Sequence, residues 1–213
     1  ILDLALSYAP EIPLLPLTEI DPQAVVLTAS LVGSPASKDR YVAPAHYQRV
    51  HEIFCEQFPQ EIGGIITNEM GAQSSTNGWV LAAMTGLPLI DAPCNGRAHP
   101  TGVMGSLGLF DEEGYRSIQV GVGGRGELET EIFVKGGLGT ASSMIRNAAT
   151  AAGGFVTVLR NPVSATYVAK HAALGALSHS IKVGQTLYSE LGNASAVVDA
   201  LARLLGTEEI CRG

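Results

Sequence analysis

The distribution of apolar and polar positions predicts strands and helices that alternate along the chain. Short apolar runs bounded by turn residues predict buried strands at residues 24–31, 62–66, 87–90 and 155–159. Apolar positions with helical spacing or helix-end signals predict helices at 45–58, 77–84, 165–171, 176–191 and 194–205, and residues 135–140 open a further helix that runs to about 152. A strand, loop, helix and strand in succession form the unit from which parallel sheets are built.

The pattern changes between residues 115 and 134. Residues 117–120 and 129–134 partly alternate between apolar and polar, which predicts a β-hairpin. The glycine-rich turn between them, residues 121–126, superficially resembles a dinucleotide-binding fingerprint. That motif requires a helix after the glycines, and here a strand follows, so we expect no nucleotide cofactor.

The elements together predict an α/β fold. We expect a mixed or mostly parallel sheet flanked by helices, with a β-hairpin insertion and a helical C-terminal part. Residues 1–20 are apolar but interrupted by Pro10, Pro13 and Pro16, so one regular helix is excluded there. The length suits a single α/β domain over 1–213, or the N-terminal domain of a longer protein. Because the chain begins with Ile1 instead of Met, we expect a segment to precede it.

Polar side chains gather in two loops that follow predicted strands. They are Asn68, Glu69, Ser75, Asp91, Cys94, Asn95, Arg97 and His99. Open α/β sheets bind ligands at the carboxyl ends of their strands, so we expect these loops to form one site. Residues 32–37 follow another strand, and residues 135–140 open a helix whose free N–H groups suit an anion. A tight turn with an ordinary helix cap is the alternative for the last segment.

Each of the catalytic candidates has a structural alternative. Glu69 and Asp91 suit general acid–base work or two ligands of a hard divalent metal, against a helix cap and an Asx-turn. Cys94 suits a nucleophile beside Arg97 and His99, against a small buried thiol. His99 suits a base or a ligand, against a structural role.

The remaining polar residues suit substrate binding: Asn68, Ser75, Asn95 and Arg97. The planar fork of Arg97 fits a carboxylate or an imide, and the alternative is an internal ion pair with Asp91. Ser75, like Ser74, is also a plausible N-cap of the helix that follows. We expect Asp91 and Arg97 within reach of each other, with Glu69 on the same rim.

Composition limits the classes of partner that we expect for this chain. A net charge of −7 without a cluster of basic residues excludes nucleic acid and anionic membranes as expected partners. Three widely spaced cysteines give no disulfide framework, and nothing resembles a cleavable signal, so we expect a cytoplasmic protein. The Gly-, Ala- and Ser-rich helices after residue 172 suggest close helix packing and, with the apolar N-terminal segment, predict a homo-oligomer. The expected ligand is a small molecule.

At these loops the sequence resembles the S-methyl thiohydantoin desulfurase family, a group linked to hydantoinases and oxoprolinases. The matching segments are Glu69-x-Gly71, Gly86-Leu87-Pro88-Leu89-Ile90-Asp91-Ala92, Gly96-Arg97-Ala98-x-Pro100, Gly33-Ser34-Pro35, and Gly175-Ala176-Leu177-Ser178 through Gly184. The similarity extends from about Ala24 to Leu187. Family members continue into a β-rich C-terminal domain, whereas this chain stops at Gly213, and Pro93 and Cys94 stand where a second acidic residue is expected.

The resemblance implies an α/β N-terminal domain and hydrolytic desulfurisation of a five-membered imide-like ring. A hydrolase of a thiohydantoin or hydantoin ring, with its site at residues 67–75 and 91–100, is therefore the first hypothesis. A non-catalytic module that binds a small anion is the second, and a subunit that needs a partner chain to complete its site is the third. Whether a divalent metal takes part stays open.

Overall fold

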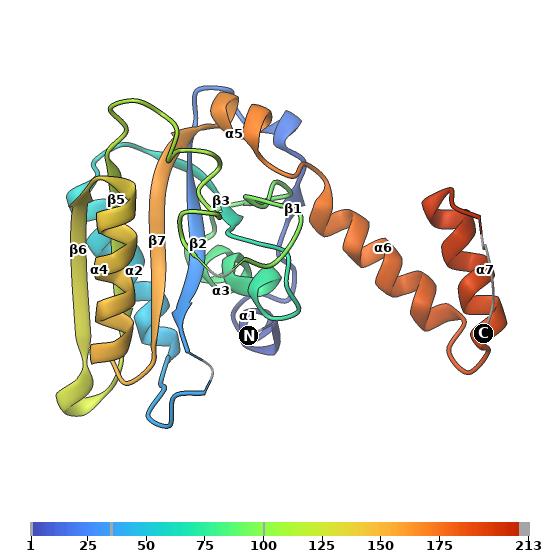
Figure 1. Ribbon diagram of the computed structural model, residues 1–213, viewed down its shortest axis with the longest axis horizontal. Helices are drawn as coiled ribbons and strands as arrows, with labels where there is room; N and C mark the ends of the chain where they lie inside the picture. Colours follow the sequence, from blue (N-terminus) through green and yellow to red (C-terminus); the bar gives the residue numbers. More distant parts are fainter. Residues whose placement is uncertain (1, 35, 100, 209–213) are drawn as a thin grey trace.

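The computed structural model describes residues 2–34, 36–99 and 101–208 and contains one seven-stranded mixed sheet in the order β1-β4-β3-β2-β7-β5-β6 (Figure 1). The strands are β1 (Leu14–Leu15), β2 (Val25–Gly33), β3 (Ile62–Thr67), β4 (Leu89–Ile90), β5 (Ser117–Gly123), β6 (Thr130–Gly136) and β7 (Phe155–Ser164). The first four strands in this order pair in parallel, and β7, β5 and β6 continue the sheet through antiparallel pairs.

Helices cover both faces of the sheet. On one face, α1 (Leu2–Tyr8), α2 (Pro44–Gln57) and α3 (Asn77–Thr85) enclose a core that joins Leu27 and Leu159 of the sheet to Phe54 of α2. On the other face, α4 (Leu138–Ala151) packs through Ile145 on Val156 and Val158. The short helix α5 (Ala165–His171) follows β7 directly, with its N-terminus capped by the Ser164 hydroxyl. Because successive side chains of a strand point to opposite faces of the sheet, alternate residues of each strand face the two helix layers.

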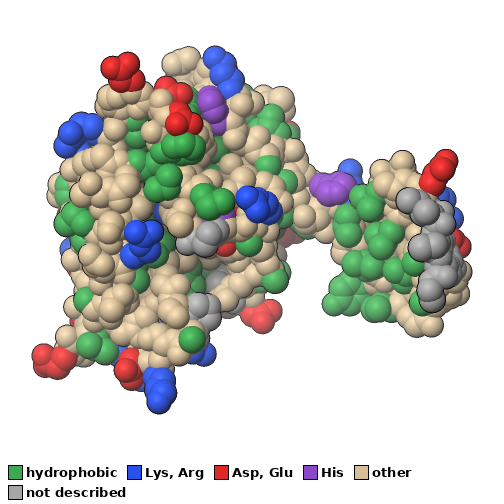
Figure 2. Space-filling model, in the orientation of Figure 1, with side chains coloured by type: hydrophobic (Ala, Val, Ile, Leu, Met, Phe, Trp, Pro, Cys, Tyr) green, Lys and Arg blue, Asp and Glu red, His purple; other side chains and the backbone are tan. Residues whose placement is uncertain are grey.

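The last two helices, α6 (Ala176–Ser189) and α7 (Ala194–Leu205), form an arm that projects from the α/β body (Figure 1). Within the arm, Asn193 caps α7 by accepting from the Ala196 N–H. Hydrophobic side chains gather on the arm (Figure 2), and Tyr188 and Leu191 are 77% and 69% exposed. A Cβ added at Gly184 would meet no atom, so the close packing expected for this stretch is not made by the described residues.

The predicted fold class is confirmed, with three differences of detail. The β-hairpin is β5 and β6, and it extends the central sheet instead of standing apart from it. Strand β7 continues past residue 159 to Ser164. The proline-broken start contains the short helix α1, which ends before Pro10, and β1, which lies between Pro13 and Pro16.

Parts of the predicted motifs lie outside the described residues, namely Ile1, Pro35, Pro100 and Cys211. Among the helices in the described part of the chain, none combines the length and apolar character that a membrane span requires.

Candidate functional site

A cavity of about 860 Å³ lies on the α4 side of the sheet. Its walls come from the end of β2 and the loop after it, the loop after β3, residues 98–99 and 101–102, one side of α4, and β7. Its polar lining includes Asn68, Glu69, Ser74, Asn77, His99, Thr101, Ser142, Arg146 and Arg160. Residues 33–34 and 36–37 and residues of both predicted loops therefore line one cavity. Ligand sites of α/β sheets lie at such strand ends.

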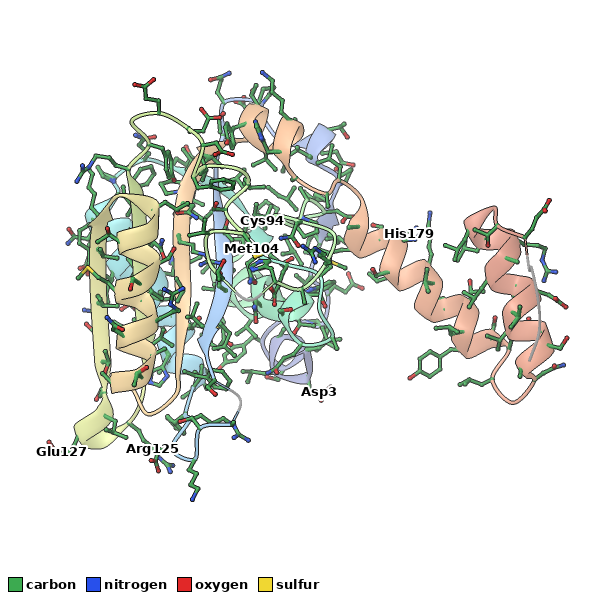
Figure 3. The ribbon with its side chains drawn as sticks, in the orientation of Figure 1. Asp3, Cys94, Met104, Arg125, Glu127 and His179 are labelled. Carbon is green, nitrogen blue, oxygen red and sulfur yellow. The ribbon has the colours of Figure 1, made fainter. Side chains whose placement is uncertain are left out.

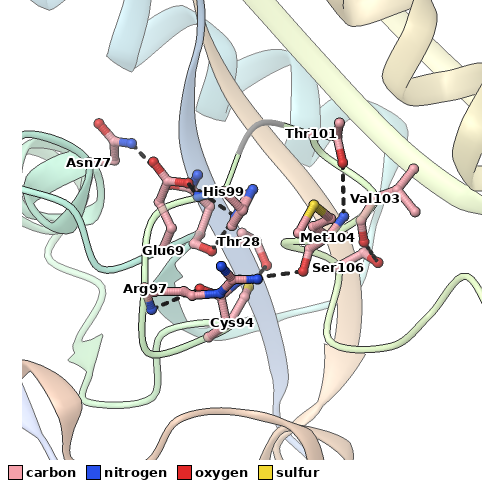
Figure 4. A network of polar contacts seen from close by, with 12 residues as sticks. Thr28, Glu69, Asn77, Cys94, Arg97, His99, Thr101, Val103, Met104 and Ser106 are labelled. Atoms are coloured by element: carbon pink, nitrogen blue, oxygen red, sulfur yellow. Dashed lines mark hydrogen bonds and ion pairs between the residues drawn. The ribbon is translucent and has the colours of Figure 1, made fainter.

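Glu69 and His99 form a close pair in the cavity wall. The Glu69 carboxylate accepts a hydrogen bond from the His99 backbone N–H at 2.9 Å, and its Oε2 lies 3.2 Å from His99 Nε2 (Figure 4). The same Nε2 lies 3.1 Å from the Asn68 carbonyl oxygen. Because a carbonyl oxygen only accepts, Nε2 carries the proton of the neutral ring, and the lone pair is on Nδ1. His99 Nδ1 is buried and has no hydrogen-bond partner among the described residues.

The backbone at Gly105 lies close to the His99 ring. A Cβ at Gly105 would collide with His99 Nε2 and Cε1, so the imidazole lies directly against the Cα of this glycine. Asn68 is held in turn by Asn77, the first residue of α3, whose Nδ2 donates to Asn68 Oδ1 at 3.0 Å. Both asparagines are buried. The orientation of His99 is thus fixed by Glu69, by the Asn68 carbonyl and by the Gly105 backbone.

Asp91 has a different neighbourhood. It follows β4, is 5% exposed, and accepts hydrogen bonds from the backbone N–H groups of Leu177 at 2.8 Å and Ser178 at 3.1 Å. These are free donors at the start of α6, where a carboxylate also interacts favourably with the helix dipole. Asp91 does not line the cavity that contains Glu69. Its surroundings are those of a helix cap.

The loop from Asn95 to Arg97 is held by hydrogen bonds between the Asn95 side chain and backbone groups. Asn95 Oδ1 accepts from the Arg97 N–H at 3.1 Å, and Asn95 Nδ2 donates to the Met104 carbonyl at 3.4 Å (Figure 4). The Arg97 carbonyl accepts from the Met70 N–H, which ties the two predicted loops together. The Arg97 side chain is exposed, and no ion pair joins it to Asp91 or to another carboxylate in the described chain.

Ser75 also lies away from the cavity lining, which instead includes its neighbour Ser74. The Ser75 N–H donates to the Gly71 carbonyl, and the Ser75 carbonyl accepts from Trp79 Nε1. Neither serine side chain caps α3, because a 3₁₀ turn at Ser74–Thr76 leads into the helix.

Cys94 is enclosed within the α/β body, close to Met104 (Figure 3). Its thiol is 4% exposed and contacts the Thr28 hydroxyl at 3.4 Å. Burial raises the pKa of Cys94 to about 11, so the thiol is protonated at neutral pH. A protonated thiol outside the cavity is a poor nucleophile.

Arg160 is the functional candidate that the sequence pattern missed. It projects from β7, is 2% exposed, and lines the cavity. Its only sequence signal is a charge that directly follows an apolar strand, which is also the ordinary signal for a strand end. The start of α4, proposed from sequence as an anion site, does not reach the lining, although Ser142, Ile145 and Arg146 of that helix do.

Among the described residues, no three His, Cys, Asp or Glu side chains come together in a way that could hold a metal ion. The polar groups that do converge, Glu69, His99, Asn68 and Arg160, suit proton transfer and recognition of a polar small molecule.

Comparisons with known proteins agree with this architecture. No curated protein matches the chain. A crystal structure of a protein from Chromobacterium violaceum is similar in fold, with a TM-score of 0.69 and 20% identity. The similarity covers 93% of this chain but 56% of that structure, so the chain spans little more than half the length of its neighbour. A family model described as the S-Me-THD-like N-terminal domain matches residues 2–125. The resemblance found at residues 69–100 is thereby confirmed, and the chain belongs to the S-Me-THD-like family through its N-terminal domain.

Proposed function

We propose that the chain carries the site of a hydrolase that removes the sulfur substituent from a five-membered S-methyl thiohydantoin-type ring. The observation that carries the proposal is the Glu69–His99 pair in the wall of a cavity of about 860 Å³. Membership of a thiohydantoin-related family supports the ring as substrate class. A cavity of this volume is of the size that binds small organic ligands.

In the proposed reaction, His99 acts as the general base. Its Nδ1 takes a proton from a water molecule, whose oxygen attacks the ring carbon that bears the S-methyl group. The new C–O bond forms, the C–S bond breaks, and the proton passes to the departing methanethiolate. The products are methanethiol and the hydantoin ring, in which the second water proton ends on the ring nitrogen.

Glu69 and Asn68 act through His99 in this scheme. Their oxygens lie 3.2 Å and 3.1 Å from Nε2, so the N–H is held on that side of the ring and the basic lone pair on the other. As the imidazole gains a proton, the nearby Glu69 carboxylate stabilises the positive charge. Asn68 and Ser74 of the lining are the proposed polar contacts to the ring. The proposal gives no chemical step to Asp91, Cys94 or Arg97.

The test is turnover of an S-methyl thiohydantoin by the purified chain, with the released methanethiol measured by a colorimetric thiol reagent. We expect His99→Asn to lower kcat by about 10²–10⁴-fold, the usual contribution of a positioned base. Glu69→Gln is expected to give a smaller loss. His179→Asn and Glu127→Gln change exposed residues, labelled in Figure 3, that do not line the cavity, and they serve as matched controls. Equal rates in His99→Asn and His179→Asn would overturn the proposal.

The alternative function is a non-catalytic module that binds a small anion, and the observation that favours it is the buried Arg160 in the same cavity. A binding module is stabilised by hydantoin-type rings but releases no methanethiol.

We also propose a homo-oligomer in which the exposed apolar side chains of α6 and α7 are covered by a second copy. A subunit of this kind shows turnover only in its assembled form.

A further inference from the structure

Arg160 is a buried cation that forms no ion pair with another described residue. Its residue is 2% exposed, and its Nε has no hydrogen-bond partner among the described groups. Glu69 and Cys94 are the groups with which it interacts electrostatically, but no described carboxylate comes within ion-pair distance. Glu69 is instead engaged by His99. Burial lowers the pKa of Arg160, yet an arginine starts from so high a value that it remains charged at neutral pH.

The surroundings of Arg160 form a polar band in an otherwise apolar layer. Thr28 of β2 and Gln119 of β5 are the register partners of Arg160 on either side, so the three side chains share one face of the sheet. Gln119 Nε2 donates to the Ser117 hydroxyl at 2.9 Å and lies 3.4 Å from the Ser142 hydroxyl. The band separates the apolar cluster around Val26 from the one around Ile145.

A distortion of β7 accompanies the band. Asn161 has a positive φ of 55°, and the β2–β7 register shifts between Val26 and Thr28, which marks a β-bulge. Asn161 Oδ1 accepts from the Ser117 hydroxyl, whereas its buried Nδ2 has no partner in the described chain. Arg160 Nε and Asn161 Nδ2, two donors, and Gln119 Oε1, one acceptor, are thus buried without partners among the described groups. A backbone conformation unfavourable for a non-glycine residue is retained beside them.

Gly102 lies close against the guanidinium in the wall of the cavity. A Cβ built on Gly102 would lie 2.6 Å from Arg160 Nη1 and 3.1 Å from the Ser142 hydroxyl. Gly102 has no positive φ, so conformation alone does not require a glycine there. The glycine lets the backbone pass close to two polar groups of the cavity lining, Arg160 and Ser142. A buried, unpaired charge is unfavourable for folding, and an acceptor that enters from the cavity would offset that penalty.

We infer that Arg160, with Ser142 beside it, binds a carboxylate carried by the substrate, so that the ring held near His99 bears an anionic side chain. The inference deepens the proposed function and rests on it for the identity of the ring. A carboxylate suits the planar guanidinium fork because it accepts two parallel hydrogen bonds. Arg160 lies beyond the family match at residues 2–125, so family membership does not assign this role.

The test compares three probes that differ only in the side chain: hydantoin-5-acetic acid, its neutral amide, and unsubstituted hydantoin. Binding is measured by calorimetry on the wild-type chain and on Arg160→Met. We expect the acid to bind the wild type about 10- to 100-fold more tightly than the amide, the scale of charge-assisted hydrogen bonds. In Arg160→Met the two affinities should be equal. The free variant should melt at or above the wild-type temperature, because an unpaired buried charge has been removed.

Two further variants make the result specific. Gly102→Ala keeps Arg160 but places a methyl group against its Nη1, which displaces the guanidinium. It should weaken binding of the acid while leaving binding of unsubstituted hydantoin nearly unaffected. Arg116→Gln removes an exposed arginine that does not line the cavity and should change nothing.

The outcomes separate this inference from the proposed function. Hydrolysis of ring substrates with no preference for the acid, or a preference that survives in Arg160→Met, overturns the carboxylate site and leaves the hydrolase in place. Arg160-dependent binding of the acid without turnover of any S-methyl thiohydantoin supports the carboxylate site and overturns the hydrolase. No binding of the acid at millimolar concentration overturns the carboxylate site.

Discussion

Replacement of Asp91 distinguishes a helix cap from a catalytic acid. Both carboxylate oxygens accept backbone N–H groups of α6, at 2.8 Å from Leu177 and 3.1 Å from Ser178. Asp91→Ala leaves two donors without an acceptor in a buried position. Since each unsatisfied buried donor costs about 1–3 kcal/mol, we expect a loss of roughly 2–4 kcal/mol at this contact. Asp91→Asn keeps one carbonyl acceptor and should lose about half as much.

The loss should appear first where α6 joins the body. Amide hydrogen exchange at Leu177 and Ser178, followed together with denaturant unfolding, measures the local and global effects. The matched control is Asp111→Asn, which changes an exposed carboxylate whose side chain makes no hydrogen bond among the described residues. Turnover of Asp91→Asn, measured well below its unfolding temperature, should stay close to that of the wild type. If Asp91→Asn exchanges and unfolds as the wild type does but loses turnover about 100-fold, the cap interpretation is wrong and Asp91 is catalytic.

Three more predictions follow from the same geometry. Gly105→Ala should displace the His99 ring, which lies against the Gly105 Cα, and should therefore lower kcat more than it lowers stability. Turnover measures the first effect and thermal melts the second. An unchanged kcat would contradict the fixed ring position. Because burial raises the pKa of Cys94 to about 11, iodoacetamide at pH 8 should leave this thiol unmodified in a chain whose other cysteines are replaced by alanine; stoichiometric alkylation seen by intact mass would contradict it. Replacing the exposed apolar Tyr188 and Leu191 with serine should lower the mass measured by light scattering, and a wild-type monomer at high concentration would rule out assembly through the arm.

Much of the fold could be predicted because its signals are local. Strands β2 and β3 are apolar runs between turn residues, and α3 ends at Gly86, which adopts the left-handed conformation with φ 72° that favours glycine. The same local signals predicted that the loops of Glu69 and His99 lie together, and the two residues are in contact. Asp91 also leaves the sheet at the predicted edge. Its role was not predictable, because the donors that engage it belong to α6, a helix remote in sequence whose direction of approach no periodicity records.

Arg160 illustrates a different limit of the sequence. A charge after Val156, Thr157, Val158 and Leu159 is the pattern of a strand that has ended, since charged side chains are rarely fully buried. Here the strand continues, because Arg160 still pairs with Thr28 on one side and Gln119 on the other. Those partners come from distant parts of the chain and meet only because β7 is inserted between β2 and β5. A buried charge is tolerated at such a position when a cavity lies in front of it and a ligand can supply the missing acceptor. The feature that hid Arg160 from pattern analysis, its burial within a strand, is therefore also the feature that makes it a candidate for binding.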